Sequence, residues 1–241
     1  MISTVLASDI PPIAGTDAAL RIRSLARAYG DTGDIVRYYA DGAGGYMALF
    51  DGTAIWHSGT DTFDEWAEFF CFVPYVRAVR CTPDAGQRIA VLWNQPCLSG
   101  QRMRYSGPCP QDQNTRSEVR LDDLHPLLRT GFPDMPPFAD WYVDVSHRVR
   151  HGCCHIACIC QDTVPVSCAM TVAEADNSVL LGAVATAPEY RGNGLAGRCV
   201  LDLVRRFYGQ DIYIAPANPG VAALYSRLGF CPMDDWAQVI R

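Results

Sequence analysis

The sequence contains no lysine, because all 20 of its basic residues are arginine. A chain without lysine has neither the phosphate-binding lysine of a P-loop nor a lysine that forms a Schiff base with a substrate. Charged residues make up only 19% of the chain, no run of basic residues occurs, and the net charge at pH 7 is −6. This charge balance argues against a nucleic-acid-binding protein.

Long apolar runs are also absent. No stretch approaches the roughly 20 apolar residues that a helix needs to cross a bilayer. Residues 1–15 lack the basic segment of a signal peptide and contain Asp9, Pro11 and Pro12. Eleven cysteines are many, but the number is odd and a 241-residue chain is too large for a disulfide scaffold. The sequence therefore predicts no membrane contact, reduced thiols and a cytoplasmic location.

The hydrophobic content of 49% is sufficient for a large core, and the length fits one large domain or two small ones. Proline, glycine and polar residues concentrate in residues 94–118, which we take as the boundary region. We therefore predict an α/β N-terminal lobe over residues 1–97 and a second domain over residues 98–241. The predicted fold class is α/β, with a mixed central sheet flanked by helices.

The N-terminal lobe carries several local signals. Residues 13–41 predict two helices, one before Gly30 and a second over Ile35–Tyr39. Asp51-Gly52 between two apolar runs predicts a β-hairpin. The further expectations are a helix over Phe63–Phe72, a strand over Val76–Cys81 and a helix over Ile89–Trp93. This order resembles the start of the C-terminal half. Three interpretations of this lobe stay open: a degenerate copy of the same unit, a lobe that contacts the substrate, and a dimerisation lobe. The last of these would make the protein a homodimer.

The C-terminal half is organised around one stretch, Ser178–Phe230. Ser178–Thr186 is an apolar run closed by Pro188, which suits a buried strand. The loop Arg191–Ala196 follows, and apolar residues then recur at helical spacing up to Phe207, with Gly209 as a stop. The remaining expectations are a strand over Arg102–Ser106, helices over Leu121–Leu128 and Phe138–Val149, and strands over His155–Gln161 and Val164–Val172.

The loop after the strand has the features of a pyrophosphate site. Gly192 and Gly194 lack a Cβ, so a phosphate can approach the backbone closely, and the following helix directs free amides and its positive dipole end at it. Arg191 adds a cation at the same point. A tight turn that merely saves space is the alternative for an isolated glycine pair. The strand before, the helix after and the arginine together favour the phosphate site.

Gly192, Gly194 and Gly197 also fit the dinucleotide fingerprint G-x-G-x-x-G. A dinucleotide fold requires further βαβ units and an acidic residue about 20 positions on. Ala217 lies near that point, and too little chain follows to build the fold. An NAD-dependent enzyme is therefore a distant alternative.

The segment Ala185–Ala196 resembles the acyl-CoA signature of the GNAT N-acyltransferase superfamily, R/Q-x-x-G-x-G/A. A second block resembles the family at the matching distance: Asn218, Ala222, Leu224, Tyr225 and Leu228-Gly229-Phe230. The resemblance implies an acetyltransferase that uses acetyl-CoA as cosubstrate, with no metal. Its acceptor would be a small-molecule or peptide amine.

The resemblance also implies roles for particular residues. The backbone of Val184, Ala185 and Thr186 would pair with the pantetheine arm, and Asn218 would lie near it. Tyr225 would donate a proton to the departing thiolate. The expected pyrophosphate loop is Arg191, Gly192, Asn193, Gly194, Leu195, Ala196 and Gly197. Without the resemblance, Tyr225 fits equally a core position, because it shares an apolar stripe with Val221, Leu224 and Leu228.

The reaction also requires a general base that takes a proton from the amine. Glu174 is the candidate we name first, since it lies just before the signature strand. Other candidates are Asp176, Asp140, Asp144 and His147, each also readable as a surface charge, and a water chain would serve as well. A non-catalytic acyl-CoA-binding sensor or interaction module is the main alternative function.

Histidine and cysteine concentrate in residues 151–160, which suggests a zinc site. Their spacing argues against one. Cys154, Cys158 and Cys160 share a parity, so on a strand they spread along one face, and buried cysteine often serves as a small hydrophobe. We expect packing residues and no metal.

Overall fold

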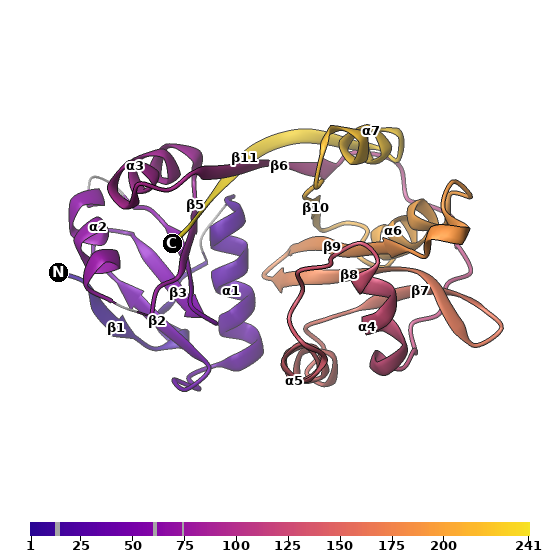
Figure 1. Cartoon of the computed structure of the whole chain (residues 1–241), viewed down its shortest axis with the longest axis horizontal. Helices are drawn as coiled ribbons and strands as arrows, with labels where there is room; N and C mark the ends of the chain where they lie inside the picture. The colour runs from indigo at the N-terminus through magenta and orange to yellow at the C-terminus, as the bar shows by residue number, and fades with distance from the viewer. Residues whose placement is uncertain (13–14, 60–61, 74) are drawn as a thin grey trace. The chain divides into compact units, whose positions relative to one another are not determined.

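The computed structural model describes residues 1–12, 15–59, 62–73 and 75–241. The chain divides into two compact units, one of residues 1–102 with 233–241 and one of residues 103–232 (Figure 1). Each unit combines a sheet with helices, so the predicted α/β class is confirmed. No helix within the described ranges is both long and apolar enough to cross a membrane.

The first unit is a mixed sheet with helices. Its elements are β1 (Ser3–Val5), the short η1 (Ala7–Asp9), α1 (Asp17–Tyr29), β2 (Val36–Ala40), β3 (Tyr46–Phe50), β4 (Thr53–His57), α2 (Phe63–Phe72), β5 (Ala78–Cys81), α3 (Pro83–Trp93), most of β6 (Cys97–Tyr105) and most of β11 (Phe230–Ile240). The strand order from β1 to β5 is sequential, and β11 follows β5. All of these pairs are antiparallel except β4 with β5.

The predictions for this unit are confirmed apart from one helix. The hairpin of β3 and β4 turns at Asp51 and Gly52, both with positive φ, as a two-residue turn of this kind requires. The predicted helix over Ile35–Tyr39 is wrong, because Val36–Ala40 is the strand β2. Valine and tyrosine favour strands, and β2 gains partners on both edges, β1 and β3. Residues 13 and 14, where the first helical pattern began, lie outside the described residues.

The second unit has the strand order β6-β10-β9-β8-β7. Its elements are α4 (Leu121–Arg129), α5 (Phe138–Arg150), β7 (Ile156–Gln161), β8 (Val164–Ala175), β9 (Ser178–Thr186), the short η2 (Pro188–Tyr190), α6 (Leu195–Arg206), β10 (Asp211–Ile214) and α7 (Pro219–Arg227), with the ends of β6 and β11. Only β9 and β10 are parallel. The helices and strands predicted for this half are all present.

The division between the units differs from the predicted boundary. The second unit begins at Met103 rather than at residue 98, and residues 233–241 belong with the first unit. The cause is the long strand β11, which the sequence analysis did not predict and which pairs with β5 over Ala237–Ile240. Because β6 and β11 each run from one unit into the other, no cut in the sequence separates two continuous domains.

The sheet of the second unit has an apolar cluster on each face. One cluster joins α6 and α7 to the sheet and includes Ala157, Ala169 and Val200. The other joins α4 and α5 to the opposite face and includes Cys158 and Cys168. Neighbouring residues on β7 and β8 thus belong to different clusters, as the alternation of side chains along a strand requires.

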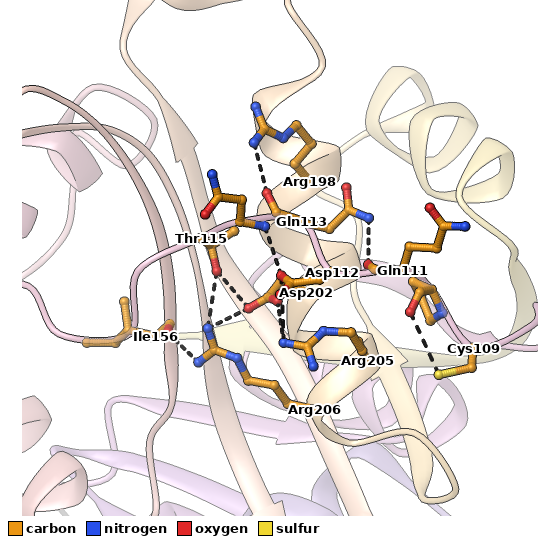
Figure 2. A network of polar contacts seen from close by, with 12 residues as sticks. Cys109, Gln111, Asp112, Gln113, Thr115, Ile156, Arg198, Asp202, Arg205 and Arg206 are labelled. Atoms are coloured by element: carbon orange, nitrogen blue, oxygen red, sulfur yellow. Dashed lines mark hydrogen bonds and ion pairs between the residues drawn. The ribbon is translucent and has the colours of Figure 1, made fainter.

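A buried carboxylate ties the segment before α4 to α6, as Figure 2 shows. Asp202 of α6 is 1% exposed, and it accepts a hydrogen bond of 2.7 Å from the Thr115 hydroxyl. It also forms ion pairs with Arg205, at 3.0 Å, and with Arg206. Arg206 in turn donates to the carbonyl of Ile156 at the start of β7. Asp202 and Arg206 therefore together hold α6, β7 and the incoming segment.

We predict that Asp202→Asn lowers the free energy of unfolding at pH 7 by about 2 kcal/mol, because it removes charged hydrogen bonds. Burial alone would raise the pKa of Asp202, but the hydrogen bonds from Thr115 and Arg205 and the charge of Arg206 outweigh it and hold the pKa below 3.8. The stabilisation is therefore complete above pH 3.8 and lost as pH falls further. Urea unfolding at pH 7 and pH 3 checks this; an equal difference at both pH values contradicts it.

Candidate functional site

The strands β9 and β10 part in the middle of the sheet. Their parallel pairing covers Ser178–Leu181 and Asp211–Ile214, and there β10 ends. The strand β9 continues to Thr186, while the chain after Ile214 leads into α7. In the described part of the chain, the β10-facing edge of β9 beyond Leu181 thus has no neighbouring strand. An unpaired strand edge offers backbone donors and acceptors to an extended ligand.

A β-bulge lies at the point where the strands part. The register between β8 and β9 skips one residue between Gly182 and Ala185, and Ala183 has a φ of +47°. The extra residue reverses the facing of the side chains. Leu181 packs in the cluster of α6, whereas Ala183 and Ala185 pack in the cluster of α4, and Val184 returns to the side of α6. In a regular strand Leu181, Ala183 and Ala185 would share one face, so the bulge is what moves Ala183 and Ala185 to the side of α4 and Val184 to the side of α6.

The start of α6 is open. Gly192 and Gly194 have φ values of +81° and +73°, which glycine tolerates, and no atom lies within 4 Å of where a Cβ would stand on either. The first turn of α6 has no acidic residue, and no side chain caps it. Among the described residues, none accepts a hydrogen bond from the amides of residues 192–197. This leaves a positive, uncapped helix N-terminus, as an anion site requires.

The loop is held by its own polar side chains. Arg191 donates from Nε to the Thr186 carbonyl at 3.1 Å and from Nη2 to the Thr130 carbonyl at 3.2 Å. The side-chain amide of Asn193 donates from Nδ2 to the Tyr190 carbonyl at 3.1 Å, so the backbone amide of this residue stays free of it. Arg191 thus links the end of β9 to the end of α4, and its remaining N–H groups are available to an anion beside the loop.

The second motif block lies at α7, beyond β10. Asn218 caps α7, with its side-chain oxygen accepting from the Val221 amide at 3.0 Å, and Pro219 follows at the first helical position. Tyr225 is 4% exposed and lies 6.1 Å from Phe230, ring centre to ring centre. Burial raises the pKa of Tyr225 to about 12, so its hydroxyl is protonated at neutral pH. Both the core position and the proton-donor role that the sequence suggested are compatible with this placement.

Glu174 lies elsewhere along the sheet. Its buried carboxylate contacts His155 Nδ1 at 2.8 Å and the Thr171 hydroxyl. Glu174 is paired in register with Val179, five residues before Val184, a separation of about 16 Å along a strand. Direct proton transfer requires hydrogen-bonding distance, so Glu174 would reach the parted strands only through water. This distance favours another base, and the role that the sequence suggested for Glu174 is left to the Glu174→Gln variant below.

The other sequence candidates for the base have different surroundings. Asp144 forms a two-point ion pair with Arg148, at 3.0 Å for each bond. His147 stacks on His151, with ring centres 4.1 Å apart. Asp140 is exposed on α5, and Asp176 lies in the β8–β9 turn with a φ of +55°. These contacts neither select nor exclude one of them.

A cavity of about 560 Å³ lies between β9 and the connection from α4 to α5. We call it the α4–α5 pocket; it is lined by Leu128, Gly131, Phe132, Pro133, Asp134, Met135, Trp141 and Ala183. This pocket was not predicted from the sequence. One feature of the sequence could have indicated it. Residues 131–138, which connect α4 to α5, are rich in apolar residues, although a connection on the surface is usually polar.

The cysteines of β7 and β8, and Cys154 just before β7, are thiols in apolar surroundings. The Cys158 and Cys160 sulfurs are 3.8 Å apart, and burial raises the pKa of Cys168 to about 12 and that of Cys154 to about 11. A raised pKa opposes the thiolate that metal binding needs. In the described ranges, no group of three or more histidine, cysteine or acidic side chains is placed to hold a metal ion.

The first unit contains a comparable strand–helix junction with different chemistry. There β4 pairs in parallel with β5 and leads to α2, as β9 pairs with β10 and leads to α6. The first turn of α2 contains Asp64 and Glu65. In addition, the Asp41 carboxylate accepts hydrogen bonds from the Thr62 hydroxyl at 2.6 Å and from Trp66 Nε1 at 2.9 Å. This junction carries negative charge where the α6 junction offers bare amides.

Comparison with known families agrees with the second unit's geometry. Residues 120–230 match the model of the acetyltransferase (GNAT) family. The C-terminal half of the chain belongs to the GNAT superfamily. The matched residues include the parted strands, the open loop, α6, α7 and the α4–α5 pocket, and we refer to residues 103–232 as the GNAT unit.

Solved structures show the same fold over a longer range. A GCN5-related N-acetyltransferase from Kribbella flavida has a TM-score of 0.61 at 13% identity, covering 95% of this chain and 96% of its own. A tandem GNAT protein from the clavulanic acid biosynthesis pathway has a TM-score of 0.62 at 11% identity, covering 100% and 98%. These identities establish a likeness of fold only, and it extends over the first unit.

A GNAT-family protein from Novosphingobium aromaticivorans is 22% identical, with a TM-score of 0.49. The match covers 60% of this chain and 64% of that protein, so the chain spans less than two thirds of its length. No curated protein matches this chain by sequence.

Proposed function

We propose that the GNAT unit transfers an acetyl group from acetyl-CoA to a primary amine by direct attack. The observation that carries this proposal is the pairing of two open features: the free edge of β9 beyond Leu181 and the uncapped start of α6. Together they would receive an extended arm and a diphosphate, the two parts of CoA that bind through backbone groups. The family of the C-terminal half consists of acetyltransferases, which supports the same reaction.

The residues that would hold CoA are those that the sequence suggested. The backbone of Val184, Ala185 and Thr186 would pair with the pantetheine arm, and the amides of residues 192–197 would bind the diphosphate beside Arg191. Glycine at 192 and 194 leaves open space there, so the loop fits such a group without rearrangement. Asn218 would bound the site at the start of α7.

Tyr225 would act on the leaving sulfur. An acid must be protonated before the reaction, and the raised pKa of Tyr225 satisfies this. A thiol has a pKa near 8.5, so complete proton transfer from a phenol of pKa about 12 is uphill. Tyr225 would therefore contribute mainly a hydrogen bond to the negative charge that develops on sulfur.

The first test is binding of acetyl-CoA by calorimetry. We expect one molecule per chain, because the negative charge at the α2 junction would repel a second diphosphate there. Gly194→Ala should weaken binding at least about tenfold, by placing a methyl group in the diphosphate space. Gly209→Ala is the matched control, since Gly209 has a φ of +98° and the same open surroundings just after α6. The proposal fails if acetyl-CoA does not bind, or if both variants weaken it equally.

A non-catalytic acyl-CoA-binding module is the alternative function. It would share the binding result and differ in turnover. Release of free thiol from acetyl-CoA, followed across a panel of primary amines, distinguishes the two: continuous release with one amine identifies an enzyme, and binding without release with any amine identifies the module.

For Tyr225→Phe we expect kcat to fall about 100-fold while the affinity for acetyl-CoA stays nearly unchanged, because the lost hydrogen bond forms only as the sulfur leaves. Steady-state thiol release and calorimetry measure the two quantities. Tyr29→Phe, at a buried tyrosine of the first unit, is the control for the loss of a buried tyrosine hydroxyl. Equal losses of kcat and affinity, or no effect, would assign Tyr225 to packing alone.

For Glu174→Gln we expect the pH profile of kcat/KM to be retained and the rate to change less than about threefold, since the carboxylate lies too far from Val184 for direct transfer. A role as the base would instead remove the acidic limb of the profile and lower the rate at least about 100-fold. Thermal unfolding of the same variant reports separately on its contact with His155.

A further inference from the structure

We propose that the α4–α5 pocket selects an arylalkyl primary amine as acceptor, its apolar body seated against Phe132 and Trp141 and its positive charge attracted by Asp134. This inference rests on the proposed function, because it takes the pocket to be the binding site of the acceptor amine. It goes further in naming the chemical class of that acceptor.

The walls of the pocket match an apolar body. Two aromatic rings, those of Phe132 and Trp141, line it together with Met135 and Leu128. Aromatic rings and a thioether offer surface that an aryl group covers with a gain of roughly 25 cal/mol per Å² of apolar area buried. A polyol or a polycation would leave its hydrogen-bonding groups unpaired against these walls. The volume, about 560 Å³, is that of a small-molecule site.

The α4–α5 pocket carries a negative charge. Asp134 is the only charged residue among the described residues that line it. A carboxylate at an otherwise apolar pocket attracts an ammonium group and repels a second carboxylate. An amine without a carboxylate therefore fits, whereas the free amino acid with the same side chain does not.

The position of the pocket connects it to the proposed acetyl-CoA site. Ala183 lines the pocket, and Val184, the next residue, belongs to the free edge of β9. These two neighbours face opposite sides of the sheet, as side chains alternate along a strand. Consecutive Cα atoms are about 3.8 Å apart, so an amine in the pocket and a thioester along the edge lie on two sides of the same short backbone segment.

The reaction balances without a further reactant. The amine, after losing one proton to water, forms a bond from nitrogen to the acetyl carbon, and the carbon–sulfur bond breaks. The electron pair leaves with sulfur, which is protonated to the free thiol, and nitrogen loses its second proton to water. The products are an N-acetylated arylalkylamine, CoA and, in net terms, one released proton.

The test uses the full-length protein with three primary amines: 2-phenylethylamine, ethanolamine and spermidine. We expect kcat/KM for 2-phenylethylamine to exceed that for each of the others at least about tenfold, as burial of an aryl group predicts. Phenylalanine, with the same body and an added carboxylate, should react poorly. Preference for ethanolamine, spermidine or phenylalanine would overturn the inference.

Two variants locate the effect. Phe132→Ala should raise KM for 2-phenylethylamine about tenfold, through lost apolar contact. Tyr142→Ala is the matched control: Tyr142 lies on α5 outside the pocket and is 40% exposed, against 39% for Phe132. Asp134→Asn should lower the affinity for 2-phenylethylamine about fivefold, within the range of exposed ion pairs. The affinity for 2-phenylethanol, which carries no charge, should not change. Equal effects of Phe132→Ala and Tyr142→Ala, or an equal effect of Asp134→Asn on amine and alcohol, would contradict the assignment.

Binding is measured independently of turnover, by calorimetry of 2-phenylethylamine and 2-phenylethanol with protein saturated with CoA. If the protein turns over polar amines and does not bind 2-phenylethylamine, the inference fails and the proposed function stands. If 2-phenylethylamine binds with the expected variant effects but no amine is acetylated, the proposed function fails and the pocket assignment stands. If neither binding nor turnover occurs, both fail.

Discussion

The parting of β9 from β10 after Leu181 is the constraint on which the rest of the GNAT unit depends. Strands that stay paired satisfy each other's backbone and leave nothing for a ligand. Here the pairing ends at Ile214, and the bulge at Ala183 turns β9 at the same level. The end of β10 leaves the edge of β9 unpaired, and the bulge turns Ala183 into the lining of the α4–α5 pocket. The start of α6, held in place through Asp202 and Arg191, completes the arrangement.

Much of the GNAT unit could be predicted from local sequence. Ser178–Thr186, the glycine loop and α6 carry strong short-range signals, namely an unbroken apolar run, two glycines and one apolar helix face. The helix cap at Asn218-Pro219 is equally local. These elements could be predicted correctly because each is determined by residues that are neighbours in the chain.

The features that sequence reasoning missed depend on distant contacts. The run Ile35–Tyr39 is too short to separate helix from strand by periodicity, and its pairing with β1 and β3 decides the outcome. In β11 the acidic residue Asp234 interrupts the apolar pattern, yet Arg102 of β6 pairs with it at 2.6 Å. The bulge and the pocket arise from packing between β8, β9, α4 and α5, which no single segment encodes.

The two units show how one arrangement of elements can carry different chemistry. The series β4–α2–β5–α3–β6 has the same order of elements as β9–α6–β10–α7–β11. The helix that follows the first of these strands begins with acidic residues in one unit and with bare amides in the other. Binding properties thus reside in the junction and not in the fold, so the proposed function assigns one CoA site to each chain.

The most direct measurement of this account is amide hydrogen exchange, resolved by residue, with and without CoA. The account predicts slower exchange at residues 184–186 and 192–197, and no change at residues 41–45 or 62–66 of the first unit. Protection confined to the first unit, or to segments away from β9 and α6, would contradict it.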